Sequence, residues 1–172
     1  MQNIDKYSTS VRFLHWLMAI LFTVIIVIGF VMVEFKESKP WGLYELHKSL
    51  GILVFGLLFL RLFMRAVSKA PPLPADTALV AKLVAHGTVV FMYICMIIMP
   101  ISGYLLSNSA GFPVKFFGIE LPVLLAKNPE LAEKIGELHE IGGWIFVGLI
   151  TLHILGVIAH HLRGFEVLRR IT

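Results

Sequence analysis

The stretch LHEIGGWIFVGLITLHILGVIAHHL, at residues 138–162, decides the fold of this 172-residue chain. It is almost wholly apolar from Ile141 to Leu162, and a helix needs about 20 such residues to cross a ~30 Å hydrocarbon layer. His139 is the second residue of the stretch and His153 lies inside it. Ionisable side chains within a membrane are costly and mark ion, proton or cofactor sites. The stretch therefore predicts both a membrane span and a functional site.

Three further stretches of the same kind precede it, at about 13–33, 46–67 and 83–106. Hydrophobic residues make up 58% of the chain and charged residues only 15%, which is outside the usual balance of soluble domains. The sequence therefore predicts an all-α integral membrane four-helix bundle, with residues 1–172 as a single domain. Including their first and last turns, the helices are expected at about 11–33, 43–67, 77–106 and 137–163.

The connections before the third and fourth helices have sequence features that predict where those helices begin. Asp76 can cap the third helix, after a short proline-rich connection. Residues 108–138 make the longest connection, which becomes amphipathic from Pro129 and is expected to lie on the outer surface before the fourth helix begins.

The basic residues predict the orientation, because lysine and arginine accumulate on the cytoplasmic side of membrane proteins. Four crossings put both termini on one side. If that side is the cytoplasm, nine basic residues, including every arginine, lie inside and six lysines lie outside. Both termini are therefore expected to be cytoplasmic. The net charge of +4 follows from this pattern and requires no nucleic-acid partner.

His139 and His153 are 14 residues apart, which is about 21 Å along a helix and within roughly 40° of the same face. One helix thus offers two ligands at two depths. A haem iron with two axial imidazoles has no open coordination position, which favours electron transfer over oxygen binding. Such a haem takes one histidine from each of two facing helices, so each of these histidines requires a partner.

Depth suggests the partners. His47 begins the second helix on the same side as His139, and His15 lies about 10 Å into the first helix from the inside. Because His153 lies about 15 Å from Arg163 at the inner end, His15 can meet it. His86 has a depth similar to that of His15, so spacing alone allows His86 to replace either inner ligand.

Other positions repeat the 14-residue interval. Gly29 lies 14 residues after His15 and would present bare backbone to the outer macrocycle. Arg61 lies 14 residues after His47, where its cation could bind a propionate of the inner haem or extend to the headgroups. His160 and His161 are expected to be solvated or to face headgroups, with a quinone or proton site as the alternative.

Several motifs together resemble the bacterial cytochrome b561 family, which is related to the di-haem b subunits of formate dehydrogenases and nickel-iron hydrogenases. The resemblance covers essentially the whole chain. It rests on RFLHW at 12–16, HKSLG at 47–51, the pair Arg61 and Arg65, MPISG at 99–103, LHE at 138–140 and LHILG at 152–156.

The resemblance implies two haem b groups, the inner one held by His15 and His153 and the outer one by His47 and His139, which excludes His86 as a ligand. It also implies a bacterial inner-membrane protein that exchanges electrons between the ubiquinone or menaquinone pool and a small periplasmic redox partner. Superoxide oxidation coupled to ubiquinone reduction is the activity implied by stand-alone members. Lys48 and neighbouring lysines could attract a small anion, although nearby glutamates offset them.

Two other functions fit parts of the pattern. The chain could be the cytochrome b subunit of a larger dehydrogenase or hydrogenase, although its short termini favour an autonomous protein. It could also be a histidine-lined metal or proton transporter, which would usually add buried carboxylates at mid-depth. None of the 11 acidic residues lies in the middle of a crossing, which favours the cytochrome.

Overall fold

The structure is a computed structural model that describes residues 6–38, 40–68, 78–164 and 167–172. Four helices in it are long and apolar enough to cross a membrane: α1 (Thr9–Glu34), α2 (Trp41–Val67), α3 (Leu79–Ser109) and α4 (Pro129–Leu162). The all-α membrane four-helix fold predicted from the sequence is thereby confirmed. Short 3-10 turns at Lys36–Ser38 and Leu168–Arg170 complete the helical elements.

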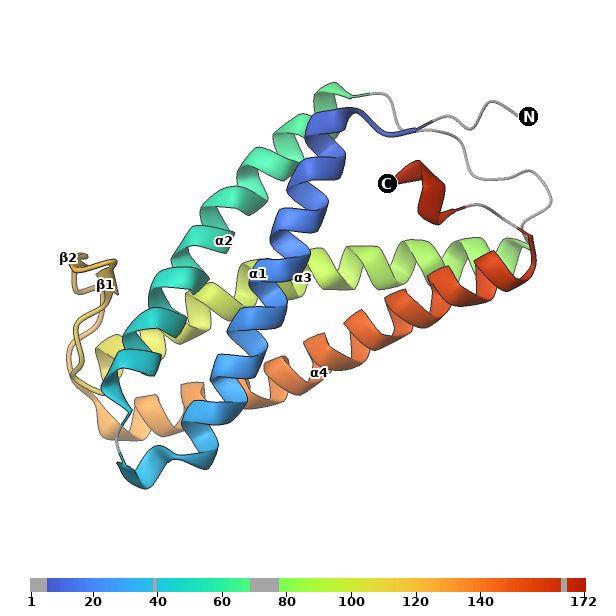
Figure 1. Ribbon diagram of the computed structural model, residues 1–172. Coiled ribbons are helices and arrows are strands. Elements are labelled where there is room, and N and C mark those ends of the chain that lie inside the picture. Colours follow the sequence, from blue (N-terminus) through green and yellow to red (C-terminus); the bar gives the residue numbers. More distant parts are fainter. Residues whose placement is uncertain (1–5, 39, 69–77, 165–166) are drawn as a thin grey trace.

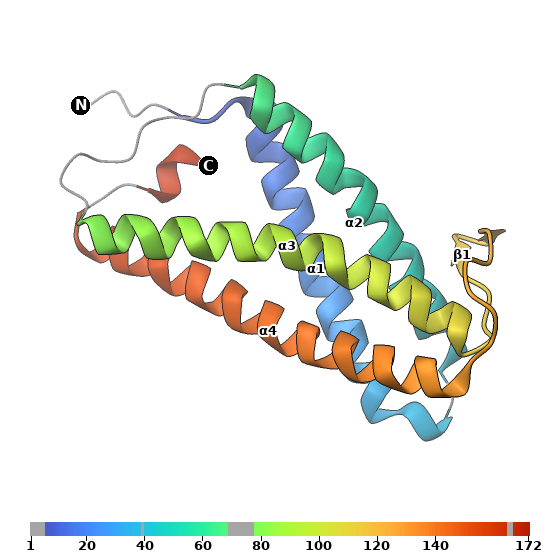
Figure 2. The same cartoon turned by 180° about the vertical axis from the view of Figure 1, so that it is seen from behind.

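The helices form two antiparallel pairs, α1 with α2 and α3 with α4 (Figures 1 and 2). The pairs diverge toward the end where α1 begins, and the C-terminal turn lies in the space between them. That turn is bonded to the start of the chain's described part, since the Tyr7 amide donates to the Arg170 carbonyl at 3.0 Å. Both ends of the described chain therefore lie at the same end of the bundle.

α4 begins at Pro129 rather than near residue 137, so the expected surface segment and the membrane span are one helix. Asn128 caps this helix, because its side chain accepts a hydrogen bond from the Leu131 amide at 3.1 Å. Proline at the first helical position is also favourable, since it has no N–H group to leave unpaired. The expected cap of α3, Asp76, lies outside the described residues.

The buried core consists of Met18 and Phe22 from α1, Val54 and Leu58 from α2, and Phe146 from α4. The rings of Phe22 and Phe146 meet edge to face, with centroids 5.2 Å apart. Along each of these helices, the core residues lie between the two levels at which the predicted site residues occur. The packed centre of the bundle therefore separates two possible sites.

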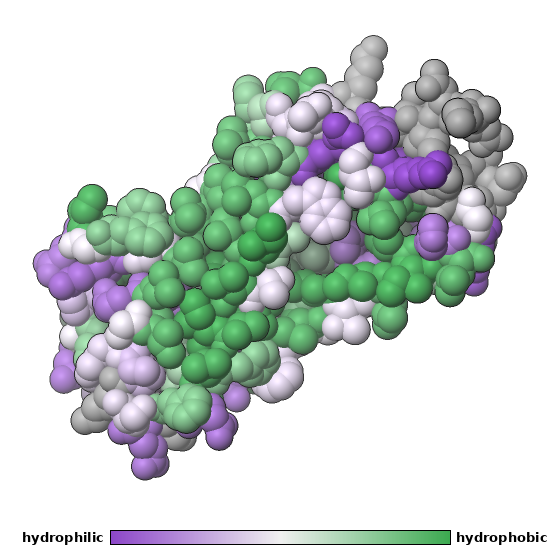
Figure 3. Space-filling model, in the orientation of Figure 1, coloured by the Kyte–Doolittle hydropathy of each residue, from purple (hydrophilic) through white to green (hydrophobic). Residues whose placement is uncertain are grey.

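The outward faces of the helices are apolar. Figure 3 shows hydrophobic side chains covering the middle of the molecule and polar side chains gathered at its two ends. Large side chains such as Phe13, Phe63 and Ile98 are more than half exposed. A hydrocarbon layer accepts such a surface, because lipid tails are as apolar as these side chains.

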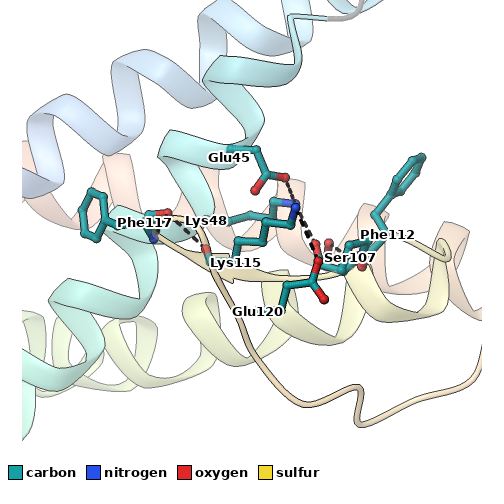
Figure 4. Close-up of polar contacts among 9 residues, drawn as sticks. Glu45, Lys48, Ser107, Phe112, Lys115, Phe117 and Glu120 are labelled. Atoms are coloured by element: carbon teal, nitrogen blue, oxygen red, sulfur yellow. Dashed lines mark hydrogen bonds and ion pairs between the residues drawn. The ribbon is translucent and has the colours of Figure 1, made fainter.

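The connection between α3 and α4 folds over the start of α2. It contains a hairpin of β1 (Lys115–Phe116) and β2 (Ile119–Glu120), joined by Phe117 and Gly118, whose φ angles are 47° and 94°. Ser49 links α2 to the hairpin by two hydrogen bonds. Its hydroxyl donates to the Lys115 carbonyl at 3.1 Å and accepts from the Phe117 amide at 3.0 Å (Figure 4).

Candidate functional site

The structure brings four of the predicted histidines together as two pairs. His47 of α2 faces His139 of α4, with ring centroids 6.3 Å apart and ring planes 73° apart. His15 of α1 faces His153 of α4, also with centroids 6.3 Å apart and with planes at 64°. We refer to the first as the outer pair and to the second as the inner pair. All four side chains are partly buried.

The outer pair is oriented by hydrogen bonds to Nδ1 of each ring. His47 Nδ1 lies 3.1 Å from the carbonyl oxygen of Ile25, and because a carbonyl only accepts, this nitrogen carries the proton. His139 Nδ1 lies 2.9 Å from the Ser102 hydroxyl, whose own proton is donated to the Met99 carbonyl at 3.0 Å. Nδ1 of His139 is therefore also a donor. Both rings consequently leave Nε2 unprotonated and able to bind a metal.

Two glycines make room for the outer pair. A Cβ atom at Gly103 would lie 3.0 Å from Cε1 of His139, and one at Gly29 would lie 3.4 Å from Cε1 of His47. Gly29 was expected to present bare backbone at this level, and it lies against the outer pair. Gly103 fills the same role on α3, where a side chain would press on the His139 ring.

The inner pair lies beside a buried cation. Nη2 of Arg61 donates to Nδ1 of His15 at 3.0 Å, because a guanidinium only donates, and Nε of Arg61 donates to the Tyr93 hydroxyl at 3.2 Å. Unlike the outer pair, His15 therefore carries its ring proton on Nε2 in this structure, and it would release that proton on binding a metal. Nη1 of Arg61 is buried and has no hydrogen-bond partner among the described residues. The guanidinium thus lies at the inner pair, and it retains a buried donor for an anionic group.

The remaining candidate residues lie away from the pairs. His86 has the expected depth but is exposed on α3, so the inner pair consists of His15 and His153. His160 and His161 lie in the last turn of α4. The ammonium of Lys48 is 2.5 Å from Glu45, one of the glutamates expected to offset its charge, and it donates to the Pro113 carbonyl at 3.0 Å (Figure 4). These contacts neutralise the charge and hold the outer connection against α2.

The ring separation of both pairs fits a metal bound between two imidazoles. A metal–imidazole bond is about 2 Å long, and roughly 1 Å more separates a ring nitrogen from its ring centre, so two rings on opposite sides of one metal have centroids about 6 Å apart. Both observed separations are 6.3 Å. The described residues contain no group of three or more His, Cys, Asp and Glu side chains suited to a bare metal ion. Each pair therefore suits a metal whose other ligands come from a flat macrocycle.

Three contributors to these sites were not assigned from the sequence. They are the phenol of Tyr93, the hydroxyl of Ser102 as a histidine partner, and the bare backbone of Gly103. Ser102 and Gly103 belong to the MPISG motif at 99–103, and Tyr93 is a tyrosine within an apolar span. The motif and the tyrosine are the sequence features from which these three contributors could have been predicted.

Comparisons with known proteins agree over most of the chain. A family model described as prokaryotic cytochrome b561 matches residues 6–172. "Cytochrome b561 homolog 2" of Escherichia coli (strain K12) is 32% identical over 161 residues, which cover 91% of this chain and 85% of that protein. "Probable superoxide oxidase CybB" of Yersinia pestis is 26% identical over 162 residues, which cover 91% of this chain and 89% of that protein.

Proposed function

Because the chain belongs to the prokaryotic cytochrome b561 family of haem b membrane electron-transfer proteins, we propose that it holds two haem b groups and passes electrons between them. Its four apolar spans and its family make it a multi-pass protein of the bacterial inner membrane. In this proposal residues 1–172 form one di-haem domain, with both termini in the cytoplasm.

The observation that supports two haem groups is the equal 6.3 Å ring separation of the outer and inner pairs. In this proposal His47 and His139 hold one group, and His15 and His153 hold the other. Bound haem would supply an iron that takes up and releases one electron. With both histidines of a pair as ligands, the group would supply electron transfer rather than oxygen binding. Arg61 has a free buried donor for a propionate.

We propose superoxide as the small partner at the outer end and ubiquinone, or menaquinone, as the partner in the membrane. This activity is supported by the 26% identical relative named as a probable superoxide oxidase. Each superoxide anion would lose one electron and become O₂, while a quinone takes up two electrons and two protons to become the quinol. Two superoxide anions would therefore be consumed for each quinol formed.

Haem content tests the proposal directly. The protein is purified in mild detergent and its haem is counted as the pyridine haemochrome, with the expected result of two haem b per chain. His139→Ala and His153→Ala are each expected to lower the count to one. His161→Ala is the matched control, because this exposed histidine lies on the same helix, and it should keep both groups.

Two results would contradict the proposal. One is a wild-type count of one or none, and the other is a count that His139→Ala and His153→Ala leave unchanged. Co-purification of the chain with an iron-sulfur protein would instead indicate a subunit of a larger dehydrogenase or hydrogenase. Stopped-flow addition of superoxide with ubiquinone tests the substrates, and quinol should form only in the variants that retain both haem groups.

A further inference from the structure

The two histidine pairs have the same ring separation but different electrostatic surroundings. The outer pair donates from His47 to a backbone carbonyl and from His139 to a serine hydroxyl. The inner pair lies against the guanidinium of Arg61. The difference is therefore between neutral acceptors at one site and a full positive charge at the other.

The hydrogen bonds of the outer pair make its rings better electron donors. A ligand histidine that donates its second N–H group to an oxygen becomes more basic. A more basic ligand stabilises the more positive, oxidised state of a bound metal, so it lowers the affinity of that site for an electron. The ion pair of Lys48 with Glu45 on α2 contributes no net charge.

The inner pair has the opposite surroundings. Arginine stays charged at any physiological pH, and the Arg61 side chain is partly buried, where charges are screened less than in water. No described carboxylate of the protein pairs with it, since its described partners are the Tyr93 hydroxyl and His15 Nδ1. A propionate bound by Arg61 would have its negative charge offset by the guanidinium, which also favours an added electron at this site. A positive charge beside the site stabilises an added electron there.

We propose that Arg61, held in position by Tyr93, makes the inner pair the electron-accepting site, so that electrons pass from the outer site to the inner site. This inference rests on the proposed function, because it requires one haem at each pair. In the transfer step one electron leaves the outer site, which is oxidised, and enters the inner site, which is reduced. No bond forms or breaks, and no side chain of this path gains or loses a proton. Tyr93 is a positioning residue that acts through Arg61.

The inner site is isolated for measurement by His139→Ala, which should retain one haem, and its potential is measured by spectroelectrochemical titration. The single wave should coincide with the higher of the two waves of the wild-type protein. Adding Arg61→Gln should weaken electron uptake at least tenfold, which is a downward shift of about 59 mV for a one-electron couple. Arg61→Lys should restore most of the shift, because it keeps the charge.

Arg65→Gln is the matched control. Arg65 lies four residues further along α2, is exposed, and contacts the ring of Tyr7 at 5.8 Å. The substitution removes the same charge from the same helix, yet it should change electron uptake by less than threefold. Tyr93→Phe should shift the potential in the same direction as Arg61→Gln but by less. In the Arg61→Gln background it should add nothing, which distinguishes positioning through Arg61 from a general loss of packing.

Several outcomes would overturn the inference. It fails if the His139→Ala wave coincides with the lower wild-type wave, or if Arg61→Gln and Arg65→Gln shift the potential equally. It also fails if Tyr93→Phe causes the same shift in potential in the Arg61→Gln background as it does alone. Should Arg61→Gln lose its haem, Arg61→Lys and Tyr93→Phe still carry the test. Failure of the proposed function is recognised separately and earlier, because His139→Ala would then not contain one haem per chain.

Discussion

Nδ1 of His139 on α4 lies 2.9 Å from the hydroxyl of Ser102 on α3. Because the Ser102 hydroxyl donates its own proton to the Met99 carbonyl, this contact places the ring proton of His139 on Nδ1 and leaves Nε2 free to bind a metal. Ser102→Ala is expected to leave Nδ1 without its acceptor and the ring free to turn. Removal of such a partner typically weakens metal binding by about 10- to 100-fold.

The measurement for Ser102→Ala is the rate at which the purified protein loses haem to an excess of a haem-scavenging protein. Half of the haem should leave faster than in the wild type, because only the outer site is affected. Ser102→Thr keeps a hydroxyl at this position and is the control. If Ser102→Ala released both groups at the wild-type rate, the serine would have no role in holding His139.

Gly103 is expected to tolerate no side chain. A Cβ atom there would lie 3.0 Å from Cε1 of His139, so the ring would have to shift by a few tenths of an ångström, which disturbs its position opposite His47. Gly103→Ala should therefore lower the haem count from two toward one and remove one of two low-spin signals in the electron paramagnetic resonance spectrum. Gly42→Ala is the control, because a Cβ atom at Gly42 would meet nothing within 4 Å. Two unchanged signals in Gly103→Ala would show that the outer pair adapts.

His86 is expected to be dispensable for haem binding. It has the depth of an inner ligand but is exposed on α3, while His15 and His153 face each other at 6.3 Å. His86→Ala should keep two haem groups per chain with an unchanged reduced spectrum. Loss of one group in this variant, with the His153→Ala protein still holding two, would reassign the inner ligand to His86.

The spans and the histidine levels could be predicted because they depend on local geometry. A helix rises by about 1.5 Å and turns by about 100° per residue, so the 14-residue interval places His139 and His153 at two depths on one face whatever surrounds them. Arg61 was placed at the level of the inner pair by the same reasoning. The assignment of these histidines as haem ligands stays a prediction that haem counting will test.

The sideways contacts of the helices could not be predicted, because the sequence does not fix how each helix is rotated about its own axis. His86 shows this clearly, since its depth matched that of an inner ligand while its face did not. Tyr93 and Ser102 became recognisable only when α3 was placed against α2 and α4. The start of α4 was missed because an amphipathic segment that continues directly into a membrane span has the sequence pattern of a separate surface helix.

Asn108 is expected to stabilise the outer connection locally. It is 3% exposed, and its side-chain oxygen accepts a hydrogen bond from the Leu124 amide at 2.7 Å. Asn108→Ala leaves that amide without its partner, which costs about 1–3 kcal/mol. Because the connection can open without the rest of the bundle, the amide of Leu124 should exchange with deuterium about 10- to 100-fold faster, whereas α4 keeps its protection.

Ser107→Ala is the control for this experiment. Its hydroxyl makes an exposed bond to the Phe112 carbonyl at 3.2 Å in the same connection (Figure 4), so its loss should change exchange at Leu124 only slightly. The haem count should stay at two in both variants, because His139 is held by α4 and Ser102 rather than by the connection. Faster exchange throughout α4 in Asn108→Ala would show instead that the connection and the outer site unfold as one unit.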